Sequence, residues 1–173
     1  MLPRKLLVSL PIFIFIYIVQ EAFVTQMRLP AGGFNLFLVF ALIWAAMSTP
    51  EVGAVTGFAT GLLMDLSQTS LGPMGHWTLV MILVGYLVAF LGYGDDNVRA
   101  NPMNFVVLVA TGVVAAQFAF VVLGLMLGDE IGSFAQFLFV LVGNAAWSAL
   151  VTPLLLPVVS RIHALVYETR SRI

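Results

Sequence analysis

The chain has 173 residues, of which 61% are hydrophobic and only 9% charged, and its formal net charge is −1. Soluble domains are typically about a quarter charged, so this chain has too few polar side chains to cover a globule in water. The composition therefore predicts an integral membrane protein, and the small net charge gives no sign of a nucleic-acid partner. Because the chain has no cysteine, disulfides and cysteine-based catalysis or metal binding are excluded.

Six apolar stretches are candidate membrane-spanning helices. A helix needs about 20 mostly apolar residues, with a range of roughly 17–25, to cross the hydrocarbon core. The predicted spans cover residues 6–24, 33–48, 50–67, 74–93, 102–127 and 133–159. The second and third are short and nearly continuous, so we expect them to form a tight helical hairpin. The sequence thus predicts one all-α polytopic membrane domain over residues 1–173.

The first stretch begins like a secretory signal peptide, with Arg4 and Lys5 before an apolar run. That run is longer than a signal peptide needs, and no small-x-small cleavage site follows it. We interpret it as a retained first helix.

Two later helix starts carry a clear signal. Thr49 precedes Pro50, and Asn101 precedes Pro102. Each pair places a capping side chain before a proline at the first helical position. We therefore expect helices to begin at both prolines.

The basic residues predict the orientation in the membrane, because cytoplasmic loops are enriched in Lys and Arg. With six spans, Arg28 alone falls on one side. The other side receives Arg4, Lys5, Arg99, Arg161, Arg170 and Arg172. Both termini are therefore predicted to face the cytoplasm.

Glycines recur at every fourth residue in the third stretch, "GAVTGFATGLLMD", and lead to one acid. Gly53, Gly57, Gly61 and Asp65 lie on nearly one face of a helix. Small residues let helices approach closely in lipid. This glycine stripe is the candidate partner-binding or helix-packing site, and it either packs against a helix of the same chain or receives one from another protein.

Asp65 has two possible roles, one structural and one functional. It can accept hydrogen bonds from amides of the following loop or pair with His76, which would be structural roles. Acidic residues within a membrane are also candidate functional groups. We expect a local structural role with functional consequences.

Other polar and proline residues lie within the predicted spans. Gln117 and Asn144 are each expected to form an interhelical hydrogen bond. Pro153 and Pro157 are expected to kink or loosen the last span.

No catalytic pattern is present in the sequence. His76 and His163 are expected on opposite sides of the membrane and cannot share a metal ion. The motifs of serine hydrolases, zinc proteases and phosphate-binding loops are absent from the sequence. We expect no enzymatic activity, no metal and no cofactor.

The stretch "GFATGLLMDLSQTSLG", followed by "YLVAFLG", resembles the signature region of the MreD family. In that family a glycine-spaced helix ends in Gly-Leu-Leu-x-Asp-Leu, and Leu-Gly follows shortly afterwards. The matching positions are Gly57, Phe58, Gly61, Leu62, Leu63, Asp65, Leu66, Leu71 and Gly72, with Gln20 and Pro30 also at family-like positions. The chain departs from the pattern in "LPAGGFN", which lacks an acid after the proline, and in "STPE", where the family often has glycine.

The resemblance implies a six-helix fold similar to the substrate-binding subunits of energy-coupling-factor transporters. It also implies a non-catalytic subunit of the bacterial rod-shape complex, or elongasome, in the cytoplasmic (inner) membrane. Such a subunit binds the single-span protein MreC and helps regulate peptidoglycan synthesis and cell shape. A RodA-type polymerase, a penicillin-binding transpeptidase and MreB are implied as indirect partners.

Two other functions remain open at this stage. The first is the substrate-binding subunit of an energy-coupling-factor vitamin transporter, with a cavity near the outer face lined by Asp65 and His76. The bulky first helix, "VSLPIFIFIYIVQ", lacks the small-residue docking motif of those subunits, which counts against this function. The second is a generic membrane chaperone or a toxin–immunity component.

Overall fold

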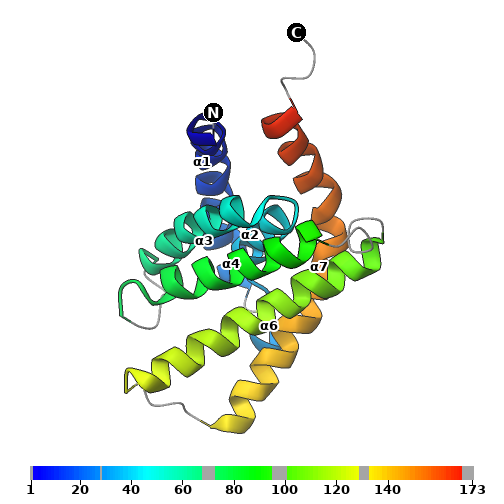
Figure 1. Ribbon diagram of the computed structural model, residues 1–173. Coiled ribbons are helices and arrows are strands. Elements are labelled where there is room, and N and C mark those ends of the chain that lie inside the picture. Colours follow the sequence, from blue (N-terminus) through cyan, green and yellow to red (C-terminus); the bar gives the residue numbers. More distant parts are fainter. Residues whose placement is uncertain (1, 28, 68–72, 95–100, 129–132, 169–173) are drawn as a thin grey trace.

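The computed structural model describes residues 2–27, 29–67, 73–94, 101–128 and 133–168, and these residues form helices and no strands (Figure 1). The α-helices are α1 (Leu2–Val19), α2 (Leu36–Ala46), α3 (Pro50–Asp65), α4 (His76–Gly94), α6 (Pro102–Met126) and α7 (Phe134–Glu168). Between α1 and α2 lie a π-helix, η1 (Gln20–Val24), and two 3-10 helices, η2 (Thr25–Met27) and η3 (Pro30–Gly32).

The length and composition of the helices indicate a membrane-embedded protein. Within the described residues, four helical stretches are long and apolar enough to cross a membrane: Val8–Met27, His76–Tyr93, Pro102–Met126 and Phe134–Tyr167. Large apolar side chains such as Phe139 are exposed along them, as expected where lipid rather than water is the solvent.

Helix α2 is the centre of the fold. Its residues from Phe37 to Ala46 are all buried, and it packs against α1, α3, α4, α6 and α7. A helix that is apolar on all sides is stable only when it is surrounded in this way. It begins later than the predicted 33–48 span, because Gly32 and Gly33 have φ values of 81° and 63°, which no α-helix accommodates.

Helices α3 and α4 form the most extensively packed pair. The bounds of α3 confirm that a helix begins at Pro50, although Thr49 makes no side-chain capping bond. Asn101 does cap its helix, because its Oδ1 accepts a hydrogen bond from Met103 N at 3.0 Å. With 16 residues, α3 is about 24 Å long and therefore shorter than the hydrocarbon core of about 30 Å.

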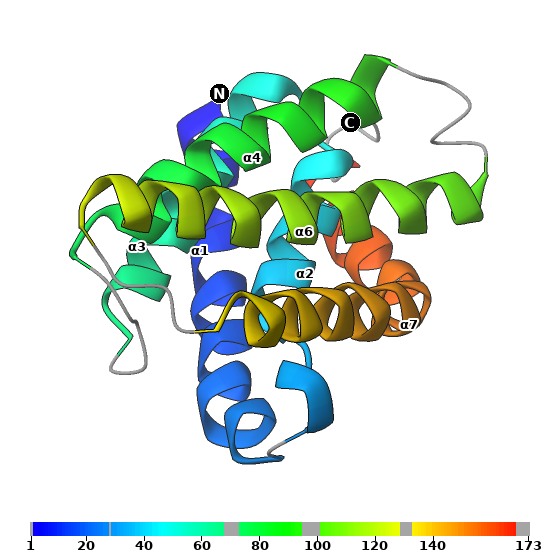
Figure 2. The same ribbon diagram turned by 90° about the horizontal axis from the view of Figure 1, so that it is seen from below.

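Helix α7 is longer than predicted. It has 35 residues and continues through Pro153 and Pro157 to Glu168, whereas the sequence suggested an end near residue 159. Its axis bends in its C-terminal half rather than breaking (Figure 1), which is how membrane helices commonly tolerate proline. The second view shows the helices crossing obliquely rather than as a parallel bundle (Figure 2).

Candidate functional site: a carboxylate-capped hairpin and an amide-lined cavity

The glycine stripe is buried between α3 and α4. A Cβ on Gly53 would lie 2.6 Å from Gly85 O, and one on Gly61 would lie 2.5 Å from Thr78 Cα. A Cβ on Gly57 would overlap the backbone oxygen of Met81. Of the two interpretations of the stripe, the structure shows packing against a helix of the same chain, so the stripe is covered and does not face another protein.

Asp65 ends α3 and caps the beginning of α4. Its carboxylate accepts hydrogen bonds from Gly75 N at 3.0 Å, Trp77 N at 2.9 Å, Thr78 N at 2.9 Å and Thr78 Oγ1 at 2.6 Å. The first amides of a helix have no partner within it and favour a negative charge. The expected bonding to loop amides is therefore confirmed. The carboxylate links the C-terminal end of α3 to the N-terminal end of α4.

His76 does not pair with Asp65, which contradicts the alternative pairing. It is only 5% exposed, and neither ring nitrogen has a hydrogen-bond partner in the structure. Its ring instead stacks on Phe120 of α6, with centroids 4.0 Å apart, and Trp77 stacks on Phe120 at 4.3 Å. His76 and Trp77 at the start of α4 therefore form an aromatic contact with Phe120 of α6.

The second histidine belongs to a separate cluster near the end of α7. His163 Nε2 lies 3.1 Å from Ser48 Oγ, and its ring packs against Trp44 and Tyr167. Among the described residues, no group of three His, Asp or Glu side chains is placed to hold a metal ion.

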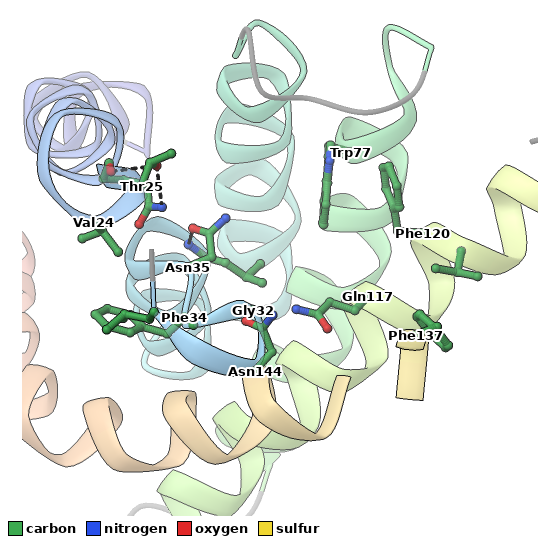
Figure 3. Close-up of a pocket in the computed structure, with 15 residues that line it drawn as sticks. Val24, Thr25, Gly32, Phe34, Asn35, Trp77, Gln117, Phe120, Phe137 and Asn144 are labelled. Atoms are coloured by element: carbon green, nitrogen blue, oxygen red, sulfur yellow. Dashed lines mark hydrogen bonds between the residues drawn. The ribbon is translucent and has the colours of Figure 1, made fainter. Parts of the chain in front are cut away.

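A cavity of about 540 Å³ lies beside the aromatic contact (Figure 3). It is formed by η1, η2, the turn that contains η3, and parts of α2, α4, α6 and α7. Its lining comprises Gln20, Val24, Thr25, Leu29, Gly32, Gly33, Phe34, Asn35, Leu38, Trp77, Gln117, Phe120, Val121, Phe137 and Asn144. Asp65 and His76, expected to line such a cavity, are not among these residues.

Two of the carboxamides at the cavity hold its wall in place. Gln20 Oε1 accepts a hydrogen bond from Leu36 N at 2.7 Å, and Asn35 Oδ1 accepts one from Leu38 N at 2.9 Å. Both bonds satisfy amides at the start of α2, which would otherwise have no partner. Gln20 also begins the π-helix, a feature that is frequent at functional sites.

The other two carboxamides differ from the sequence-based expectation. Gln117 and Asn144 make no hydrogen bond with any described residue, so the expected interhelical bonds are not formed. In Figure 3 both side chains point toward the space beside Gly32. The sequence identified each amide as a polar residue in a span, but nothing in it indicated that they face one cavity.

A second hollow lies between α1 and α3, on the side of α3 away from the glycine stripe. This α1–α3 groove has a volume of about 370 Å³. Its lining consists of Ser9, Leu10, Phe13, Ile14, Val55, Thr56, Phe58, Ala59, Leu62 and Leu63. The two helices pack against α2 but scarcely against each other, so the groove separates them.

Comparisons with protein-family models, with curated proteins and with solved structures gave no match to this chain. These comparisons assign the chain to no family.

Proposed function

We propose that this protein is an MreD-type, non-catalytic membrane subunit of the bacterial rod-shape complex, which binds MreC and helps regulate peptidoglycan synthesis. The observation that carries the proposal is the resemblance of residues 57–72 to the MreD signature. Leu71 and Gly72 of that segment lie outside the described residues.

The geometry supports the proposal by giving the matching residues a common task. Gly57 and Gly61 bring α3 against the backbone of α4, and Asp65 then caps α4. A spaced glycine motif that ends in an acid is what such a capped, tightly packed hairpin requires. We therefore interpret the signature as a structural motif that keeps the α3–α4 hairpin rigid.

We propose six crossings with both termini in the cytoplasm, in a fold similar to that of the energy-coupling-factor binding subunits. Helices α2 and α3 would be the two short crossings, and the four long helices the others. In support, the beginning of α1 and the end of α7 lie on the same side of the molecule (Figure 1), as an even number of crossings requires.

The proposed surface for MreC is the α1–α3 groove. Its rim carries exposed apolar side chains such as Phe58, which is 50% exposed, while Ser9, Thr56 and Ala59 are small residues along it. In lipid, small residues let a second helix approach closely, and packing contacts then replace those with lipid chains. A single membrane-spanning helix, as the resemblance implies for MreC, fits this chemistry.

Purification of the tagged protein from its own cells in mild detergent, followed by mass spectrometry, tests the function. We expect a single-span protein with a large extracytoplasmic domain, together with a RodA-type polymerase and a penicillin-binding transpeptidase. Recovery of ATPases and a coupling subunit instead would contradict the proposal.

That second outcome would identify a substrate-binding subunit of a vitamin transporter. One observation favours this alternative, namely a cavity whose volume of about 540 Å³ lies within the range of small-molecule sites, roughly 300–1,000 Å³.

A further inference from the structure

The cavity contains two carboxamides without partners. Asn144 is only 8% exposed, and neither it nor Gln117 makes a hydrogen bond with a described residue. Because no described residue satisfies them, both carboxamides are available to hydrogen-bond a molecule in the cavity. The two amides come from different helices, α7 and α6, yet both point into the same space (Figure 3).

The described lining residues carry no ionisable group. Their polar members are Gln20, Thr25, Asn35, Gln117 and Asn144. A carboxamide offers both donors and an acceptor, whereas phosphate and carboxylate ligands are typically held by Arg or Lys and a cationic ligand by a carboxylate. The described part of the lining therefore favours an uncharged group that has both donors and acceptors, such as a hydroxyl or an amide.

The walls add a flat apolar surface in a fixed arrangement. The stacked Trp77 and Phe120 form one side. On another side the turn at η3 is held against α7, because Trp147 Nε1 donates a hydrogen bond to Pro30 O at 3.1 Å and Gly143 packs closely on Ala31. A cavity whose walls are already in place loses little conformational freedom when it binds a ligand.

We propose that this cavity binds the uncharged hydroxyl- or amide-bearing part of a small molecule, with Asn144 and Gln117 as its hydrogen-bonding partners and Trp77 and Phe120 against its apolar part. The group belongs either to a neutral lipid headgroup or to a free soluble molecule. This site is independent of the α1–α3 groove, so its failure would leave the proposed function untouched.

Native mass spectrometry of the full chain, purified in mild detergent, tests the site with three probes. 1-Monooleoylglycerol represents the neutral lipid, N-acetylglucosamine the soluble molecule, and dioleoylphosphatidylglycerol an anionic lipid. We expect saturable binding of one neutral probe, which also identifies the source, and no competition from the anionic lipid. Binding of both neutral probes also supports the shared chemistry.

Two substitutions assign the binding to the amides. Asn144→Leu and Gln117→Leu should each weaken binding about tenfold, as expected for one lost hydrogen bond. Gln136→Leu, at an exposed position of α7 outside the cavity, makes the same chemical change and should leave binding unaltered.

Stability distinguishes a ligand-binding amide from a structural one. Without probe, Gln117→Leu and Asn144→Leu should unfold at about the wild-type temperature or above, because neither substitution removes a hydrogen bond to the described protein. If Asn144→Leu does not fold, the half-buried Gln117 still carries the test. The proposal is overturned if neither neutral probe binds, if both variants bind like the wild type, or if the anionic lipid displaces the neutral probe.

Discussion

Asp65 illustrates how one carboxylate within a membrane protein acquires a structural role. Its carboxylate accepts hydrogen bonds from three backbone amides and one hydroxyl at the start of α4. The sequence predicted this role because the acid stands at the end of a helix and before a short loop. It did not predict that His76 would turn away to stack on Phe120, since that contact depends on where α6 crosses α4.

Asp65→Asn should lower stability markedly. The substitution removes the negative charge and places an NH₂ group where amide donors converge, and hydrogen bonds to a charged group contribute about 1.5–3 kcal/mol. For a chain of this size we expect the apparent Tm in mild detergent to fall by about 3–12 °C.

Glu51→Gln is the matched control for this charge. Glu51 is exposed in the first turn of α3, where the helix dipole favours an acid by about 0.3–1 kcal/mol. A change at Glu51 as large as that at Asp65 would contradict the capping role.

At the scale of elements, the sequence indicated most helices but not their arrangement. All six apolar stretches look alike in composition, so nothing marked α2 as the element that every other α-helix surrounds. The glycine stripe predicted close packing, but the sequence could not decide between a helix of the same chain and a helix of another protein, because both would present the same kind of surface. The cavity could not be predicted from the sequence either, because it depends on how η3, α6 and α7 pack against one another.

Gly57→Ala tests the contact between α3 and α4. A Cβ there would overlap the backbone of Met81, and backbone cannot move aside as a side chain can. Overpacking of this kind costs about 1–3 kcal/mol, so the apparent Tm should fall.

Gly112→Ala provides the matched control, because a Cβ on Gly112 of α6 meets only side-chain ends, the nearest being Val88 Cγ2 at 2.8 Å. Side chains of Val88 and Leu42 can shift by less costly adjustments than a backbone can, so Gly112→Ala should lower the apparent Tm less than Gly57→Ala. The reverse order would show that the two helices are not held together as described.

At the scale of the whole molecule, the absence of cysteine from the sequence allows the orientation to be tested without preparatory substitutions. We expect Met74→Cys and Met126→Cys to react with a membrane-impermeant maleimide from outside intact spheroplasts. Glu51→Cys and Met103→Cys should react only after permeabilisation. All four positions are exposed in the structure.

Labelling of Glu51→Cys from outside, with the other three as expected, would mean that α2 and α3 do not cross the membrane. Labelling of Met103→Cys from outside and of Met74→Cys only from inside would reverse the proposed orientation, in which the cytoplasmic side carries most basic residues.

The most direct test of the proposed function is site-specific photo-crosslinking in living cells. A benzophenone amino acid placed at Phe58, in the α1–α3 groove, should form an adduct with the single-span partner MreC. The same probe at Phe139 on α7, which is 65% exposed but outside the groove, should form none. An MreC adduct at Phe139 and none at Phe58 would contradict the groove as the docking surface, and no MreC adduct at either position would contradict the proposed partnership.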